Sequence, residues 1–213
     1  MSNTLFHPAP PPYTDRAQRS RANHLGMWTF LGTEILFFGG LFASYTLYRV
    51  AYPEAFSAGS GELEFWIGTV NTGVLLTSSL CMALADLAVK AGARRAVQWN
   101  LVATWLLGAL FLALKFHEYR LAWEEHHVPG LRFAYAGSHA PQVELFMFHY
   151  FAMTGLHAAH MLAGLAAIAW LIRLNHRGRI GSGHDAPVAM VALYWHFVDC
   201  VWIFLYPLLY LVR

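Results

Sequence analysis

Polar and ionisable side chains interrupt segments of this sequence that are otherwise strongly apolar. Inserting a charged side chain at the middle of a bilayer costs a free energy of about 2.5 to 3.5 kcal/mol on insertion scales. Such residues therefore usually face protein or water, and they often have a functional role. Carboxyl and imidazole groups in this setting can hold a proton or a metal. The sequence therefore predicts a polar seam within membrane helices, made of Glu34, Asn71, Asp86, His149, His157, His160, His196 and Asp199.

Glu34 is the most isolated of these groups. The segments around it, WTFLG before and LFFGG after, offer nothing that could pair with its charge. Burial penalises the charged form of a carboxyl group, so we expect a neutral side chain at rest. Two interpretations stay open. Glu34 is either a protonated glutamate hydrogen-bonded to a neighbouring helix, or a carboxyl group that handles protons or contacts lipid.

Three histidines of one apolar segment are spaced so that they can share a helix face. His157 follows His149 by eight residues, and His160 follows by three more. Histidines on facing membrane helices can hold haem b or copper. No second segment offers a matching pair of histidines, so we predict hydrogen bonds between helices and no metal bound by this chain.

His196 and Asp199 form a second candidate pair. They are three residues apart, so both can lie on one face of a helix. A carboxylate beside an imidazole fixes its tautomer. We predict a structural pair at this position.

The elements that must position these groups are long apolar segments. Of 213 residues, 57% are hydrophobic and 12% are charged, which is typical of a membrane protein, and 14 basic residues against 12 acidic ones give no reason to expect nucleic-acid binding. A helix crosses a hydrocarbon core of about 30 Å with about 20 residues. We therefore predict an all-α fold, a bundle of five transmembrane helices over residues 25–48, 65–89, 98–122, 143–173 and 188–211.

The rest of the chain is predicted to lie outside the bilayer. Residues 1–22 are polar and proline-rich, and we expect a mobile tail there, before a single membrane domain over residues 23–213. The segment from Tyr52 to Glu64 is predicted to be a loop. At the end of the third span, Lys115 is expected to extend outward to water.

The basic residues divide unequally between the two sides of the predicted bundle. One side carries Arg16, Arg19, Arg21, Lys90, Arg94, Arg95, Arg173, Arg177 and Arg179. The other side carries Arg49, Lys115, Arg120, Arg132 and Arg213. By the positive-inside rule the N-terminus is cytoplasmic and the C-terminus is outside.

Motifs on the five segments, taken in order, resemble subunit III of the haem-copper oxidases. The matching stretches are WTFLGTEILFFGGLF (28–42), Asn71 and Thr72 followed by VLLTSS, Glu118 with Tyr119, TGLHAAH (154–160) and YWHFVDCVWIFLY (194–206). A single HxxH motif would be weak evidence for a family. Five matches in the same order on five separate segments are specific evidence. The chain is similar to the short five-helix form of that family, because only a tail precedes the segment around Trp28.

This resemblance implies a non-catalytic core subunit in a bacterial plasma membrane. The subunit would bind directly to subunit I, which carries haem and copper, in a complex with subunit II that oxidises cytochrome c, reduces oxygen to water and pumps protons. It would bind phospholipid and support proton uptake and the stability of subunit I. In longer members, two additional helices form one wall of the lipid cleft, so the short form is expected to have a less complete cleft.

The resemblance also assigns positions within the family motifs. Glu34 matches the family's intramembrane glutamate, and none of the matching positions is a redox ligand in the family. The other positions on the motifs are His157, His160, Tyr194, Trp195, His196 and Asp199. A role related to protons or lipid is expected for Glu34, His157, His160, His196 and Asp199. Packing or interface roles are expected for Asn71, Glu118, Tyr194, Trp195 and Trp202.

Other functions remain open from the sequence. The accessory subunit of a nitric oxide reductase shares the five-helix plan, and subunit III of a quinol oxidase is a further alternative. A membrane haem protein acting alone belongs to a different class, which a visible spectrum would reveal. A transporter would be expected to carry an inverted repeat or a broken helix pair, and neither is evident.

Overall fold

The chain folds into α-helices connected by short loops. The computed structural model describes residues 16–130, 133–181 and 186–212. Within these ranges there are six helices and no strand: α1 (Arg16–Ala51), α2 (Pro53–Gly61), α3 (Phe65–Lys90), α4 (Arg94–Glu124), α5 (Ala140–His176) and α6 (Ala186–Tyr210). All of them except α2 are long and apolar enough to cross a membrane. The predicted all-α class and its five spans are confirmed.

Two predicted boundaries were wrong. Residues 16–22, assigned to the tail, are the first turns of α1, because the sequence from Arg16 to Leu25 contains good helix formers and no Pro or Gly. Residues 1–15 of that predicted tail lie outside the described residues. The predicted loop from Tyr52 to Glu64 contains α2, which begins with Pro53 and has Glu54 in its first turn, both favourable at a helix N-terminus.

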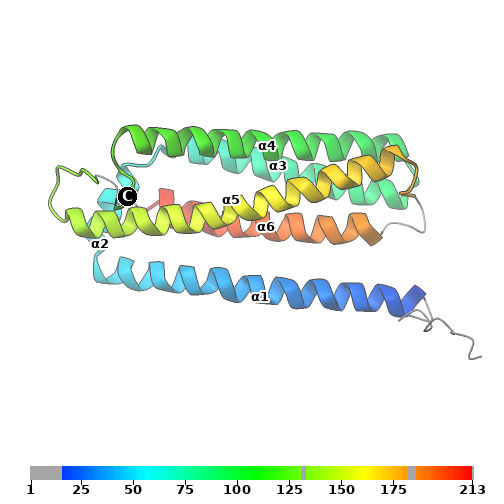
Figure 1. Ribbon diagram of the computed structural model, residues 1–213, viewed down its shortest axis with the longest axis horizontal. Coiled ribbons are helices and arrows are strands. Elements are labelled where there is room, and N and C mark those ends of the chain that lie inside the picture. The colour runs from blue at the N-terminus through cyan, green and yellow to red at the C-terminus, as the bar shows by residue number, and fades with distance from the viewer. Residues whose placement is uncertain (1–15, 131–132, 182–185, 213) are drawn as a thin grey trace, which may run out of the picture.

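Helices α3, α4, α5 and α6 pack into a bundle, and α1 runs along one side of it (Figure 1). The inner face of α1 is marked by Leu31, Phe38 and Tyr45, which are buried at intervals of seven residues. These side chains meet α5 and α6, while most of α1 is exposed. The outer face of α1 is therefore available to lipid or to another chain.

Close packing inside the bundle depends on glycine. A Cβ added to Gly108 of α4 or to Gly164 of α5 would lie 2.7 or 2.8 Å from the ring of Trp195, which is fully buried on α6. Gly164 and Gly108 thus permit close approach of α5 and α4 to α6. At Gly39 and Gly40 of α1, in contrast, an added Cβ would meet nothing within 4 Å in the described chain.

The two ends of the bundle carry opposite charge. The end where α1 begins also holds the end of α3, the start of α4 and the end of α5 (Figure 1). Six of the basic residues predicted to be cytoplasmic gather there: Lys90, Arg94, Arg95, Arg173, Arg177 and Arg179. The opposite end, with α2, carries the glutamates Glu54, Glu62, Glu64, Glu124, Glu125 and Glu144.

Candidate functional site

Glu34 has a partner on another helix. Its Oε2 lies 3.0 Å from Nε2 of His160, which connects α1 to α5. The two side chains are 18% and 15% exposed, so the pair lies at the edge of the bundle, partly shielded from the bilayer. The hydroxyl of Tyr194 on α6 donates to the backbone carbonyl of His160 at 3.1 Å, which ties a third helix to the same place.

The hydrogen bonds of His160 limit where its proton can be. Nδ1 lies 2.9 Å from the backbone carbonyl of Leu156, and a carbonyl only accepts, so Nδ1 carries a hydrogen. If the imidazole is neutral, Nε2 is an acceptor and Glu34 must be protonated to donate to it. If Nε2 is protonated, an imidazolium faces a carboxylate. In both cases Glu34 and Nε2 of His160 share one proton.

His149 makes a similar contact with α1, nearer the end of that helix. Its Nε2 lies 3.0 Å from the hydroxyl of Ser44, while its Nδ1 faces the carbonyl of Leu145 at 2.9 Å. The hydroxyl of Tyr45 donates to the carbonyl of Leu208 on α6. Helix α1 is thus attached through polar contacts spaced along its inner face, in addition to its buried apolar residues.

The prediction that three histidines share one face was wrong for His157. His149 and His160 both face α1, whereas His157 is rotated by about 60° from His160 on an ideal helix and faces α4 and α6. Its ring lies 5.5 Å from that of Phe111 and 5.2 Å from that of Trp202, measured between centroids. The side chain is fully buried, and neither ring nitrogen has a hydrogen-bond partner within the described structure.

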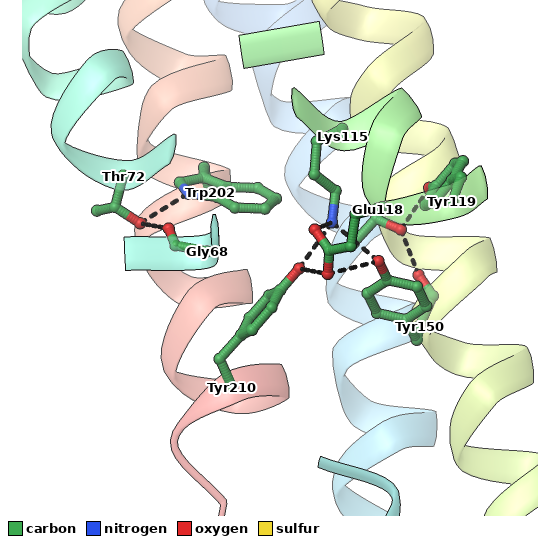
Figure 2. Close-up of polar contacts among 9 residues, drawn as sticks. Gly68, Thr72, Lys115, Glu118, Tyr119, Tyr150, Trp202 and Tyr210 are labelled. Atoms are coloured by element: carbon green, nitrogen blue, oxygen red, sulfur yellow. Dashed lines mark hydrogen bonds and ion pairs between the residues drawn. The ribbon is translucent and has the colours of Figure 1, made fainter. Parts of the chain in front are cut away.

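The prediction that Lys115 extends outward to water was wrong. Its side chain is 4% exposed, and its ammonium group donates to Glu118 Oε2 at 3.1 Å, to the Tyr150 hydroxyl at 3.1 Å and to the Tyr210 hydroxyl at 2.7 Å (Figure 2). These three acceptors satisfy all three N–H groups of the ammonium. The physical reason for the correction is that Lys115 lies on the inner face of α4, three residues before its counter-ion.

Glu118 is held as completely as Lys115. Its Oε1 accepts hydrogen bonds from the Tyr150 hydroxyl at 2.9 Å and from the Tyr210 hydroxyl at 2.6 Å. The rings of Tyr119, Tyr150, Trp202 and Tyr210 surround the ammonium, with centroids 4.8 to 5.6 Å from Nζ. A buried charge in this setting is stabilised by hydrogen bonds and by the faces of aromatic rings. We call Lys115, Glu118, Tyr150 and Tyr210 the ion-pair cluster.

Sequence reasoning missed most of the ion-pair cluster. Glu118 was expected in a packing role, but Lys115 was assigned to the surface and Tyr150 was not singled out. The available signal was the spacing of Lys115 and Glu118, because oppositely charged residues three apart face each other on a helix.

The predicted pair of His196 with Asp199 is not formed. Nδ1 of His196 lies 2.8 Å from the hydroxyl of Ser79 on α3. Asp199 is buried close enough to the Ser79 hydroxyl to interact with it, but no hydrogen bond of normal length and angle reaches either carboxyl oxygen within the described ranges. The reason is that α3 packs along α6 here, so the histidine bonds across the interface rather than along its own helix.

Of the remaining predicted residues, Asp86 forms an ion pair with Lys90 on α3, and the others pack in the bundle. The indole of Trp195 donates to Ser78 at 3.2 Å, and that of Trp202 donates to Thr72 at 3.0 Å, as Figure 2 shows for the second pair. Asn71 is buried, and both of its amide atoms lack partners in the part of the chain that the structure describes. Trp195, Trp202 and Asn71 thus lie at helix contacts.

The side chains do not converge as metal ligands. Among the described residues, no group of three or more His, Cys, Asp and Glu side chains is arranged to hold a metal ion. His160 is engaged by Glu34 and His196 by Ser79. This arrangement can share a proton at the Glu34–His160 pair and holds helices together elsewhere.

These features define a class of protein: a helical membrane protein with a partly shielded glutamate–histidine pair and a buried ion pair between its helices. Comparison with known proteins identifies the family. Residues 16–212 match the family described as "Cytochrome c oxidase subunit III". The chain belongs to this family, and it is an integral membrane subunit of a haem-copper oxidase, an oxidoreductase complex.

Individual relatives include subunits of more than one oxidase type. Cytochrome c oxidase subunit 3 of Thermostichus vulcanus is 34% identical over 189 residues, which cover 88% of this chain and 86% of the relative. Cytochrome bo(3) ubiquinol oxidase subunit 3 of Pseudomonas aeruginosa is 30% identical over 200 residues, 93% of this chain and 89% of the relative. In Aeropyrum pernix, "Heme-copper oxidase subunit I+III" is 29% identical over 192 residues, which cover 87% of this chain but 22% of that protein.

Proposed function

We propose that this chain is the non-catalytic core subunit III of a haem-copper terminal oxidase that oxidises cytochrome c and reduces oxygen to water with proton pumping. The match of residues 16–212 to the cytochrome c oxidase subunit III family carries this proposal. Haem and copper would be held by partner subunits. The contribution of this chain would be to stabilise subunit I, to bind phospholipid and to support proton uptake.

The Glu34–His160 pair is the feature that fits a role in proton handling. Its two polar atoms are 3.0 Å apart, so one proton can move between them without displacement of either side chain. The pair lies between α1 and the bundle, next to the exposed apolar face of α1. A lipid bound to this face of α1 would regulate how far the Glu34–His160 pair is exposed to the bilayer.

Subunit composition tests the proposal. The tagged chain should be purified in mild detergent from the membranes of its own organism, and the subunits that accompany it should be identified. We expect a haem-copper subunit I and a subunit II with a copper site, together with oxygen consumption driven by reduced cytochrome c. A quinol-driven activity would favour the ubiquinol oxidase type, which the Pseudomonas aeruginosa relative represents. Isolation with the catalytic subunit of a nitric oxide reductase would contradict the proposal.

The proposed orientation in the bacterial plasma membrane has the N-terminus in the cytoplasm and the C-terminus outside. It is supported by the basic residues that gather where α1 begins and by the glutamates at the opposite end. A reporter that is active only in the cytoplasm should therefore work when it is fused near Arg95 or Arg179 and fail near Gly130. Activity near Gly130 alone would reverse the orientation.

We further expect the isolated chain to bind no haem, copper or iron. The reason is that His149, His160 and His196 bond to neighbouring helices, while neither ring nitrogen of His157 has a partner among the described residues. Elemental analysis and a visible spectrum of the pure chain test this prediction, with the His157→Ala variant as the matched control. Stoichiometric metal that disappears in the His157→Ala variant would show that the chain has a redox centre of its own.

A further inference from the structure

Most polar side chains on the outer faces of the spans satisfy their own hydrogen bonds. Hydroxyl groups of Thr29, Thr46 and Thr77 each donate to the backbone carbonyl four residues earlier in the same helix. The half-buried amide of Asn100 on α4 does the same, because Nδ2 donates to the carbonyl of Ala96 at 2.9 Å. Such groups present little free hydrogen-bonding capacity to lipid.

The contact of α3 and α6 departs from this pattern. At the contact of α3 and α6, the Ser79 hydroxyl occupies Nδ1 of His196, and no described residue bonds to Nε2 of that imidazole. Asp199 lies just inside, 3% exposed and close to the same serine, and among the described residues no hydrogen bond of normal geometry reaches either of its carboxyl oxygens. Both residues lie near the midpoint of α6 (Ala186–Tyr210), which is where unsatisfied polar groups cost most in a membrane.

Exposed apolar side chains surround these polar groups. On an ideal helix Leu76 and Leu80 lie outward of Ser79 on α3, and Ile203 lies outward of Asp199 on α6. All three are 46% to 60% exposed, and Cys200 is exposed beside them. We call this surface the α3/α6 face, and its residues are Leu76, Ser79, Leu80, His196, Asp199, Cys200 and Ile203.

We propose that the α3/α6 face binds a transmembrane helix of oxidase subunit I that carries a polar side chain opposite His196 and Asp199. This inference rests on the proposed function, because it assigns the surface of the subunit III chain that meets subunit I. An acyl chain offers no donor or acceptor to these groups, whereas a polar side chain on a partner helix does. The A. pernix relative, whose name joins subunits I and III, supports the choice of subunit I as the occupant.

Photo-crosslinking in the intact complex tests the inference. A benzophenone amino acid is placed at Cys200 on the α3/α6 face or, as the matched control, at Phe116, which is 73% exposed on α4. After irradiation we expect at least tenfold more covalent adduct with subunit I from position 200 than from position 116. Adducts with lipid alone from position 200, or equal yields from both positions, would overturn the inference.

A second measurement tests the contribution of the polar side chain of His196 to binding of subunit I. In the His196→Phe variant the ring volume is largely kept and the hydrogen bonds are lost, so the amount of subunit I retained by the tagged chain should fall at least fivefold. The Asn100→Leu variant, which removes a self-satisfied polar group from α4, should retain subunit I as the wild type does. Full retention by His196→Phe would contradict the role given to this histidine.

The outcome for the wild type separates the two proposals. If the tagged wild-type chain retains no haem-copper subunit I, the proposed function itself fails. If subunit I is retained but position 200 does not crosslink to it, only the assignment of the α3/α6 face fails.

Discussion

Glu118→Ala should strongly destabilise the helical bundle. It removes the counter-ion of Lys115, whose ammonium would then stay buried with only the hydroxyls of Tyr150 and Tyr210 as acceptors. Removing one partner of a buried ion pair typically costs about 3 to 5 kcal/mol, because the remaining charge is uncompensated. Unfolding of the purified complex or chain, followed by circular dichroism during titration with sodium dodecyl sulfate, measures the loss.

A matched control lies on the same helix. Arg120 and Glu124 also form an ion pair, at 2.8 Å, but their side chains are 70% and 54% exposed. Glu124→Ala should therefore cost about 0 to 1 kcal/mol. Replacing Lys115 and Glu118 together by methionine should cost less than Glu118→Ala alone, since no unpaired charge is left. Equal effects of Glu118→Ala and Glu124→Ala would show that the buried pair contributes no more than a surface pair.

The ion-pair cluster explains how a lysine can lie inside a membrane bundle. Three helices contribute its polar groups: α4 supplies Lys115 and Glu118, α5 supplies Tyr150, and α6 supplies Tyr210. Each hydroxyl accepts from the ammonium and donates to the carboxylate, so the tyrosines connect the two charges. The cluster therefore fixes the register of three helices at one end of the bundle, where apolar packing alone would tolerate sliding.

The spans were predictable from hydropathy because a bilayer imposes a length and an apolar composition on each helix. The register between helices was not predictable in the same way. His196 bonds to Ser79 rather than to Asp199, and His157 faces away from α1, because a rotation of about 60° decides which neighbour a side chain meets. Hydropathy does not specify that rotation.

The sequence also did not identify the partner of Glu34 on another helix. Its isolation within an apolar segment correctly marked it as a residue that needs a partner, but nothing nearby in the sequence identified His160, which is 126 residues away. Lys115 was assigned wrongly. Its place near the end of an apolar segment suggested an exposed side chain, and only Glu118 on the same helix face indicated a buried ion pair.

Substitutions of Glu34 should distinguish a structural role of its side chain from a role in proton exchange. In Glu34→Gln the side chain keeps its length, and its amide can donate to Nε2 of His160 while Nδ1 continues to donate to the carbonyl of Leu156. Assembly should survive. Glu34→Ala instead leaves Nε2 without its partner at a cost of about 1 to 3 kcal/mol, so attachment of the chain to subunit I should weaken.

The decisive measurement is oxygen uptake by the purified Glu34→Gln complex, followed through many turnovers beside wild type at matched subunit content. If the pair exchanges protons or its state depends on bound lipid, the initial rate should be near normal, and the rate of proton uptake should change or activity should be lost with continued turnover. Ser44→Ala is the matched control, because it removes another polar contact between α1 and α5 without a titratable carboxyl group. Equal initial rates, pH profiles and lifetimes for Glu34→Gln and wild type would leave Glu34 with a structural role alone, since a glutamine reproduces the hydrogen bond but cannot release a proton.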